Sequence, residues 1–177
     1  MTQARRQLVL LRHAKAVTGG PDMTDFARPL AERGQKAAAR MGRYLAEHRL
    51  APDLVLCSPA RRTRETWALA APALPPAETR LVDELYDFGG GESLLAVIRR
   101  DGGSARRLLL VGHNPAIQGL ALMLAGSGEA ALRRQMAEKY PTAGLSILDF
   151  TSGAWASTAA ATGTLAGFVR PRDLGAD

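Results

Sequence analysis

Basic side chains follow three apolar runs of this sequence, in positions where they could bind a phosphoryl group together. Arg12 and His13 come directly after QLVLL, and His113 and Asn114 follow RLLLVG. The run DLVLC ends at Ser58, with several arginines after it. Guanidinium and imidazole groups supply the positive charge and the hydrogen-bond donors that phosphate oxygens accept. The residues predict an anion site, provided that the fold brings the three positions together.

The apolar runs predict three buried strands, at 7–11, 53–58 and 107–112. Each run is continuously apolar rather than alternating, as is typical of strands that are covered on both faces. In an open sheet of parallel strands, ligands bind outside the carboxyl ends of the strands. The residues that follow the three runs are therefore expected to share one edge of the sheet.

Helical patterns alternate with these strands. They cover 30–48 and 62–71, begin again near Glu92, and resume after Pro115 in AIQGLALMLAG. Gly34 lies inside the first of these helices, where glycine lowers helix propensity. Alternation with short connections predicts an α/β fold, a three-layer αβα sandwich around a mostly parallel sheet.

Three further segments after Gly144 are typical of strands joined by turns. They are LSILDF, WASTAA and TLAGFV, separated by threonine, serine and glycine. They predict that the sheet gains an antiparallel edge.

Length and composition favour a single globular domain over residues 1–177. A content of 46% hydrophobic and 23% charged residues is ordinary for such a domain and excludes extensive disorder. No apolar stretch approaches the roughly 18 residues of a membrane-spanning helix. We therefore expect a cytoplasmic protein without membrane contact, whose oligomeric state the sequence does not indicate.

The net charge of +6 permits an anionic partner, but the pattern argues against nucleic acid. Arginine pairs are scattered along the chain, and aromatic residues, which would stack on bases, make up only 5%. No HExxH motif or Cys/His cluster is present, so we expect neither a metal nor a cofactor. The glycine-rich GGGES lacks the spacing of a nucleotide-binding loop.

Three motifs resemble those of the histidine phosphatase superfamily, which has the phosphoglycerate mutase-like fold. LRHAKA resembles its RHG-type signature, SPARRTRET its second-arginine motif, and VGHNPAI its second-histidine motif. DFARPLAERG, DELYDFG and the compact length are most similar to the phosphohistidine phosphatase branch of SixA type. Alanine replaces the usual glycine after His13, as in other members of this branch. The resemblance covers most of the chain and implies one histidine phosphatase domain.

The resemblance implies a role for each matching residue. His13 would be the nucleophile, Arg12, Arg62 and His113 would bind the phosphoryl oxygens, and Glu84 would be a proton donor. Family spacing selects Arg62, while Arg61 and Arg64 should point elsewhere on the helix. Asp83 and Asp87 remain alternatives to Glu84. Arg28 could reach the phosphate or brace its loop, and Lys15 could touch the substrate.

The implied chemistry is consistent with the residue types. A histidine nucleophile must be unprotonated, and its reference pKa is about 6.5. Neighbouring arginines should lower the pKa of His13 by like-charge repulsion while they orient the phosphate. Attack would give a phosphohistidine intermediate that water hydrolyses. Cys57 is not an alternative nucleophile, because Arg62 and Arg64 lie five and seven residues after it, whereas a Cys-x5-Arg loop requires six.

Compactness favours phosphohistidine on a protein as the substrate. Only 28 residues separate Glu84 from His113 (113 − 84 − 1), and they must supply a helix and a strand, which leaves little for a lid. An uncovered site suits a phosphohistidine that protrudes from another protein, with a histidine-phosphotransfer protein as the candidate partner. The alternatives are a small-molecule phosphomonoesterase or mutase-like enzyme, and a phosphoprotein-binding module without catalysis.

Overall fold

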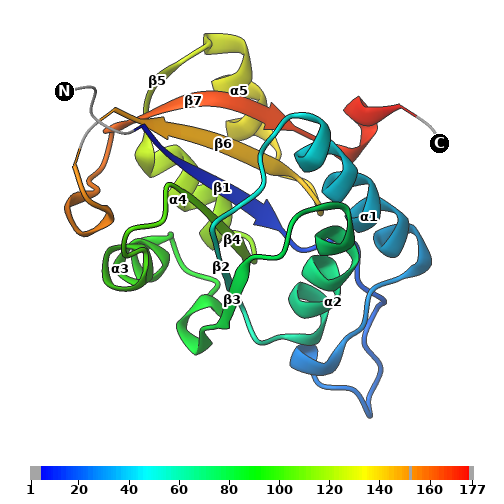
Figure 1. The fold of residues 1–177 in the computed structure, drawn as a ribbon. Coiled ribbons are helices and arrows are strands. Elements are labelled where there is room, and N and C mark those ends of the chain that lie inside the picture. The colour runs from blue at the N-terminus through cyan, green and yellow to red at the C-terminus, as the bar shows by residue number, and fades with distance from the viewer. Residues whose placement is uncertain (1–4, 152, 176–177) are drawn as a thin grey trace.

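A sheet of seven strands forms the centre of the computed structural model, which describes residues 5–151 and 153–175 (Figure 1). Its strands are β1 (Arg6–Arg12), β2 (Leu54–Cys57), β3 (Glu78–Leu81), β4 (Arg107–Gly112), β5 (Ala125–Gly128), β6 (Leu145–Phe150) and β7 (Gly163–Val169). Their order in the sheet is β3-β2-β4-β1-β6-β7-β5. β6 pairs antiparallel with both of its neighbours, β1 and β7, whereas the other pairs are parallel. The mostly parallel sheet with antiparallel pairing on one side is confirmed.

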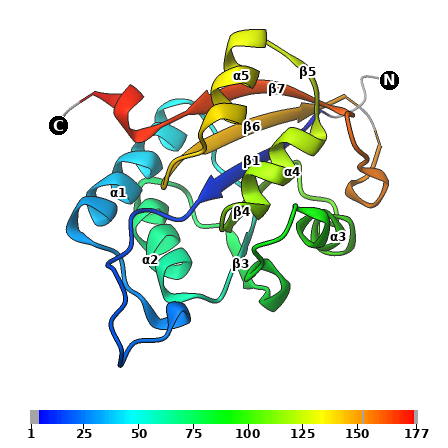
Figure 2. The same ribbon diagram turned by 180° about the vertical axis from the view of Figure 1, so that it is seen from behind.

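Helices cover both faces of the sheet and complete the three layers (Figures 1 and 2). On one face lie α1 (Glu32–Glu47) and α2 (Arg61–Ala70), and on the other α3 (Glu92–Asp101), α4 (Ala116–Leu124) and α5 (Ala130–Glu138). None of the helices within the described residues combines the length and the apolar character that a membrane crossing requires.

The central strands are apolar throughout because each face meets a different helical layer. In β1, Leu8 and Leu10 belong to the core under α3, α4 and α5, while Val9 and Leu11 belong to the core under α1 and α2. Strand side chains alternate between faces, so two covered faces require an uninterrupted apolar run. β2 and β4 divide their residues between the two cores in the same way.

The register aligns the carboxyl ends of the three central strands. Arg12 pairs with Gly112 across β1 and β4, and Cys57 pairs with Val111 across β2 and β4. The residues that follow these strands therefore meet at one edge of the sheet. The long connection from β1 to α1, which includes the 3-10 turn η1 (Asp25–Ala27), begins at the same edge.

Gly34 lets this connection pack against α1. A Cβ atom at this position would overlap the backbone carbonyl of Lys15, two residues beyond His13. The glycine that lowers helix propensity thus allows the close contact between α1 and the segment that carries the nucleophile candidate. The backbone N–H of Ala31, just before α1, also donates to the Lys15 carbonyl at 2.8 Å.

The predicted strand in WASTAA is wrong. Trp155–Ser157 form a 3-10 turn, η4. The indole of Trp155 is buried and donates from Nε1 to the carbonyl of Ala105 at 2.7 Å, while the Ser157 hydroxyl bonds to the backbone of Ala154. A single buried anchor and a local serine cap stabilise a turn here, rather than a strand with alternating faces.

Three elements were not expected from the sequence. β3 is an edge strand with all four residues exposed, and β5 has the sequence AGSG. α5 buries only Met136 completely. Each of these elements has too little apolar periodicity to be recognised from the sequence pattern.

Candidate active site

A pocket of about 220 Å³ lies at the carboxyl edge of the sheet, where the three central strands end. β1 and the segment after it contribute Arg12, His13 and Lys15, and α2 contributes Arg62. The remaining lining residues come from loops: Ala16, Asp25, Arg28, Phe88, Asn114 and Thr142. Three of the expected site residues, Arg12, His13 and Arg62, thus meet at one small pocket.

His13 is buried at this pocket, with one ring nitrogen held by the backbone. The backbone N–H of His13 donates to the carbonyl of Gly112 at 3.0 Å, which extends the pairing of β1 with β4 by one residue. Its Nδ1 lies 2.8 Å from the carbonyl oxygen of Ala14. A carbonyl can only accept, so the ring proton is on Nδ1 and the lone pair is on Nε2.

The surroundings keep the His13 ring neutral. Its pKa is lowered to about 4, mainly because burial disfavours the charged form, and further by the positive charges of Arg62, Arg12 and Arg28. The direction agrees with the expectation from the neighbouring arginines, but burial is the larger cause. At neutral pH, His13 has the protonation state of a nucleophile.

Arg62 is almost completely buried in the first turn of α2, with only 1% of its surface exposed. Its Nη1 donates to the backbone carbonyl of Asp25 at 2.7 Å, and its Nη2 donates to the carboxylate of Asp25 at 3.0 Å. Arg61, one residue earlier, points away, is half exposed and pairs with Glu65 at 2.7 Å. The 100° turn between consecutive helical residues separates the two arginines.

Arg12 ends β1 and is fixed by the backbone of a distant segment. Its Nη1 donates to the carbonyl of Tyr140 at 2.8 Å. Tyr140 is buried, and its hydroxyl donates to the carbonyl of Leu10. Burial lowers the pKa of Arg12. An arginine guanidinium nevertheless stays protonated in proteins, so Arg12 is a fixed positive charge.

His113 is buried next to His13, with a distance of 5.2 Å between the ring centroids. Its Nε2 lies 2.7 Å from the hydroxyl of Ser58. Its pKa is lowered to about 3, mainly by burial and then by the nearby His13 and Arg62. His113 is therefore neutral at physiological pH, and its ring can donate one hydrogen bond.

Three buried nitrogens at this edge have no hydrogen-bond partner among the described residues: Arg12 Nε, Arg62 Nε and His113 Nδ1, which is a donor when Nε2 accepts from the Ser58 hydroxyl. Buried polar atoms are nearly always paired, because leaving one unpaired costs about 1–3 kcal/mol. The unpaired atoms belong to the same residues that the sequence predicted as ligands of a phosphoryl group. A bound oxyanion is the kind of acceptor that they lack.

Asp25 contributes a carboxylate that the sequence analysis missed. It accepts hydrogen bonds from Arg28, Arg62 and the hydroxyl of Tyr86, which hold its pKa well below the usual range. Arg28 also donates to the carbonyl of Val17 at 3.0 Å, so it braces the loop and lines the pocket at once. In the sequence, Asp25 stands three residues before Arg28 in DFAR, and this spacing indicates a carboxylate–arginine pair.

The structure does not bring Glu84 into the pocket. Glu84 lies in the 3-10 turn η3 (Asp83–Leu85), is half exposed, and pairs with Arg100 of α3 at 2.7 Å. The hydrogen bond from Arg100 lowers the pKa of Glu84, which favours the ionised form over the protonated form of a proton donor. Neither Asp83 nor Asp87 lines the pocket.

Aromatic side chains form one rim of the pocket. Tyr86 packs edge-on against both Phe26 and Phe88, with ring centroids 5.2 and 5.0 Å apart. Phe88 lines the pocket, is 46% exposed and lies 5.1 Å from the ring of His113. The rim therefore offers an exposed aromatic face beside the cationic site.

Cys57 lacks the properties of a nucleophile. It is buried in the core under α1 and α2, and burial raises the pKa of its thiol to about 12. In the described part of the chain, no group of three or more His, Cys, Asp or Glu side chains is arranged to hold a metal ion.

The amino-acid sequence is similar to that of known proteins over most of its length. Residues 8–96 match the family model of the histidine phosphatase superfamily, branch 1. An uncharacterised protein from Mycobacterium tuberculosis (strain ATCC 25618 / H37Rv) is 39% identical over 168 residues, which cover 92% of this chain and all of that protein.

Two solved structures have the same fold over nearly their whole length. One is a candidate phosphohistidine phosphatase SixA from Nakamurella multipartitia, 34% identical, with a TM-score of 0.80 over 97% of this chain and 99% of that one. The other is a candidate phosphohistidine phosphatase SixA from Agrobacterium tumefaciens, 31% identical, with a TM-score of 0.79 over 94% and 98% of the two chains.

Proposed function

The chain belongs to the histidine phosphatase superfamily and to its SixA-type branch, and from this premise we propose that it removes phosphoryl groups through a covalent phosphohistidine on His13. One observation carries the proposal: the only proton of the neutral His13 ring is held by the Ala14 carbonyl, which leaves Nε2 unprotonated. Arg12 and Arg62, together with Lys15 and Arg28, line the same pocket and make it positively charged.

In the first step, Nε2 of His13 attacks the phosphorus atom. A nitrogen–phosphorus bond forms, and the bond from phosphorus to the leaving group breaks with its electron pair on the leaving group. Arg12, Arg62 and His113 stabilise the charge on the phosphoryl oxygens as it develops. Positioning and charge neutralisation are the main tasks of the protein, because a phosphoryl transfer requires few other groups.

In the second step, water attacks the phosphohistidine and breaks the nitrogen–phosphorus bond. Inorganic phosphate leaves with the oxygen of the water, one proton of the water goes to phosphate or solvent, and His13 returns to its neutral form. Its Nδ1 can keep the hydrogen bond to Ala14 throughout, which holds the ring in one orientation.

We propose that the substrate is phosphohistidine on a protein. An alkoxide leaving group needs a proton from an acid, and Glu84 is paired with Arg100 outside the pocket. An imidazole leaving group can take its proton from water at the other ring nitrogen, so it needs no acid. The exposed ring of Phe88 offers a surface on which the substrate imidazole can pack.

The segment between Glu84 and His113 supports the same substrate. It contains α3 and β4, and only turns connect them to each other and to the site. No helix or strand of this segment is left to fold over the pocket within the described residues. A histidine on the surface of another protein can therefore approach the site directly.

Trapping the intermediate tests the covalent mechanism. We expect acid-labile, alkali-stable phosphate on the wild-type protein after brief reaction, and neither this phosphate nor turnover in His13→Ala. A matched control is His48→Ala, which removes the exposed third histidine from the end of α1. Near-normal turnover in His13→Ala would refute the mechanism.

Comparing substrates tests the substrate class. We expect kcat/KM to be highest for a histidine-phosphotransfer protein phosphorylated on its histidine, lower for free phosphohistidine and lowest for phosphate esters. A preference for a small ester by about tenfold, equal to about 1.4 kcal/mol of transition-state binding, would assign a small-molecule phosphatase and leave the chemistry of His13 unchanged.

A further inference from the structure

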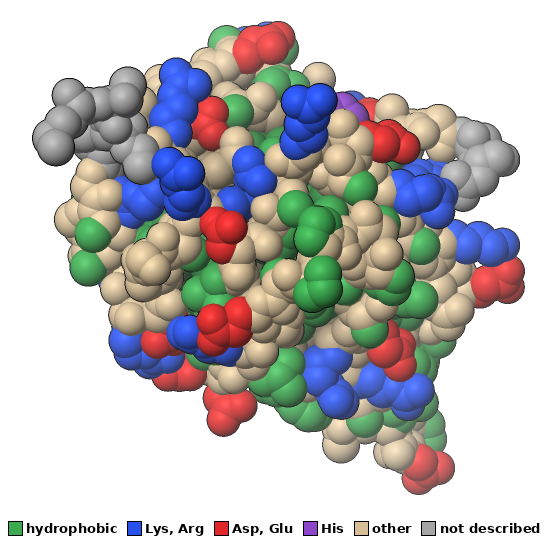
Figure 3. All heavy atoms as spheres, viewed as in Figure 1, with side chains coloured by type: hydrophobic (Ala, Val, Ile, Leu, Met, Phe, Trp, Pro, Cys, Tyr) green, Lys and Arg blue, Asp and Glu red, His purple; other side chains and the backbone are tan. Residues whose placement is uncertain are grey.

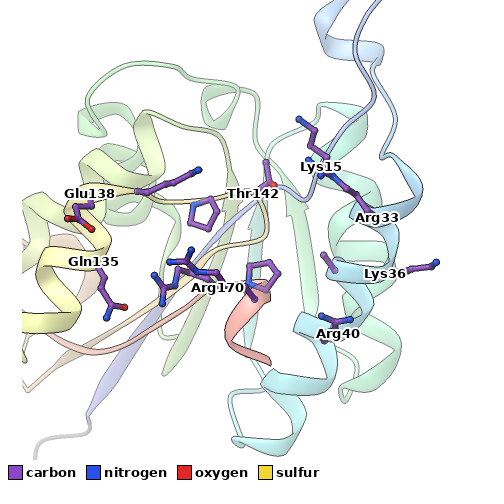
Figure 4. Close-up of a pocket in the computed structure, with 13 residues that line it drawn as sticks. Lys15, Arg33, Lys36, Arg40, Gln135, Glu138, Thr142 and Arg170 are labelled. Atoms are coloured by element: carbon purple, nitrogen blue, oxygen red, sulfur yellow. The ribbon is translucent and has the colours of Figure 1, made fainter. Parts of the chain in front are cut away.

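The pocket that contains Arg12, His13 and Arg62 is here called the catalytic pocket. A second cavity, the basic groove, adjoins it. It has a volume of about 610 Å³ and lies between α1 on one side and the end of α5 with the turn at 170–172 on the other (Figure 4). Lys15 and Thr142 line both the basic groove and the catalytic pocket. A molecule that places a phosphoryl group next to His13 can therefore extend into the basic groove.

Positive charge dominates this groove. Seven of its lining residues are lysine or arginine, and Glu138 is the one carboxylate among those residues. Lys36 pairs with Glu32 and Arg170 pairs with Asp173. Lys15, Arg33 and Lys139 form no ion pair with another described residue. The groove thus has cationic groups that remain available to an anionic ligand.

The cations of α1 form a regular row. Arg33, Lys36 and Arg40 are separated by three and four residues, so they lie on one face of the helix. The row from Arg33 to Arg40 is about 10 Å long, at 1.5 Å of helix rise per residue. Within this row, Lys36 already pairs with Glu32, so Arg33 is the cation of the row that forms no ion pair with another described residue.

The remaining surface of the basic groove favours a polypeptide over a nucleic acid. Its lining includes Ala37, Pro141 and Pro171 but no aromatic residue on which bases could stack. On the face shown in Figure 3, lysine and arginine side chains lie in separate groups with acidic side chains between them, unlike a continuous track for a phosphate backbone. A polypeptide could place its acidic side chains on the cations of the groove and its apolar side chains on the apolar residues between them.

We propose that the basic groove binds an acidic segment of the phosphoprotein substrate while its phosphohistidine occupies the catalytic pocket. This inference rests on the proposed function, because it concerns how that same substrate is recognised. Glutamate or aspartate near the phosphorylated histidine would pair with Arg33, Lys15 and Lys139. The groove would therefore select among phosphohistidine proteins by the charge around the modified residue.

Two synthetic peptides test this proposal. Each carries one phosphohistidine, flanked by glutamates in the first peptide and by glutamines in the second. We expect the wild type to prefer the acidic peptide by about tenfold in kcat/KM, mainly through KM, because several weak ion pairs add up. Arg33→Glu should remove this preference and leave the hydrolysis of an aryl phosphate unchanged, which shows that the variant is folded.

Arg106→Glu is the matched control. Arg106 is exposed just before β4, at the opposite edge of the sheet, and its substitution changes the net charge by the same amount. We expect it to keep the preference for the acidic peptide. Equal effects of the two substitutions would show that net charge, and not the basic groove, causes the preference, and would overturn the proposal.

The remaining outcomes separate the two proposals. Equal rates on both peptides with the wild type would refute the role of the groove and keep the proposed substrate. Hydrolysis of the aryl phosphate but of neither peptide would refute the substrate and with it the role of the groove. Inhibition by an oligodeoxynucleotide as strong as that by a polyglutamate peptide of equal charge would assign the groove to nucleic acid instead.

Discussion

The catalytic pocket and the basic groove are both cationic, but they hold their charges in different ways. In the pocket, Arg62 is almost fully buried, and backbone carbonyls fix both Arg62 and Arg12. In the groove, Arg33 and Lys36 are exposed on the surface of α1. Under the two proposals, the fixed, buried charges would stabilise a transition state, and the exposed charges would contribute affinity for the substrate protein.

Burial explains why the two regions should differ in energy. A buried cation interacts strongly with an anion, because little water remains to screen it. An exposed ion pair contributes only about 0.2–1 kcal/mol and weakens with salt. We therefore expect substitutions in the pocket to affect the chemical step and substitutions in the groove to affect the binding of large substrates.

The largest expected effect separates two adjacent arginines. Arg62→Ala removes a buried donor of the pocket and should lower kcat for an aryl phosphate by about a hundredfold or more. Arg61→Ala removes an exposed partner of Glu65 and should change kcat by less than about twofold. Arg12→Ala and His113→Ala should resemble Arg62→Ala. Equal losses in Arg61→Ala and Arg62→Ala would show that burial does not distinguish their roles.

The next largest expected effect is on salt dependence, which should differ between a substrate that uses the basic groove and one that uses only the catalytic pocket. Raising NaCl from about 0.05 to 0.5 M shortens the Debye length from roughly 14 to 4 Å. We expect kcat/KM for the acidic phosphopeptide to fall several-fold, because exposed pairs in the basic groove are screened. The rate on an aryl phosphate should change by less than about twofold. A similar loss on both substrates would mean that the pocket is as accessible to salt as the groove.

A smaller expected effect concerns stability: the free energy of unfolding should depend on pH because His13 and His113 are buried. Their lowered pKa values, about 4 for His13 and about 3 for His113, mean that both rings stay neutral well below the ordinary value of about 6.5. Unfolded chains bind these protons near pH 6.5, so the free energy of unfolding should fall as the pH drops from about 6.5 toward 4.

NMR of the histidine ring nitrogens can measure this titration. The spectra should show a neutral His13 with its proton on Nδ1 at pH 5.5. His13→Gln identifies the signals, and a ring that titrates near pH 6.5 would contradict the buried geometry.

The smallest expected effect concerns Glu84. Because Glu84 pairs with Arg100 on the surface, Glu84→Gln should lower kcat for a phosphohistidine substrate by less than about threefold. Arg100→Gln, which removes the other half of the same ion pair, is the control. A loss of about a hundredfold in Glu84→Gln alone would indicate that Glu84 turns into the pocket and acts as a proton donor.

Features set by buried strands could be predicted from the sequence. The positions of Arg12, His13 and His113 follow directly from continuous apolar runs, which mark strands between two helical layers. Asp25 could not be found in this way, because it reaches the pocket from a loop whose course depends on contacts with Arg28 and Arg62.

The elements that were missed or misassigned have a common cause. β3 and β5 lie at the two edges of the sheet, where few side chains need to be apolar. WASTAA predicts a strand because one aromatic residue among small residues does not show which backbone conformation buries Trp155. The family resemblance implies Glu84 as a proton donor, whereas the direction of its side chain is set by the turn η3 and by Arg100.

The position of β1 in the middle of the sheet also affects how the protein is made. β1 emerges from the ribosome before its partners, which are β4, about a hundred residues later, and β6, later still. Such long-range pairing slows folding, and it delays the burial of an apolar strand during synthesis. Arg12 gains its carbonyl partner only when Tyr140 has been added. The catalytic pocket therefore cannot assemble before residue 140 has left the ribosome, and until then the apolar strand β1 lacks the partners that would cover it.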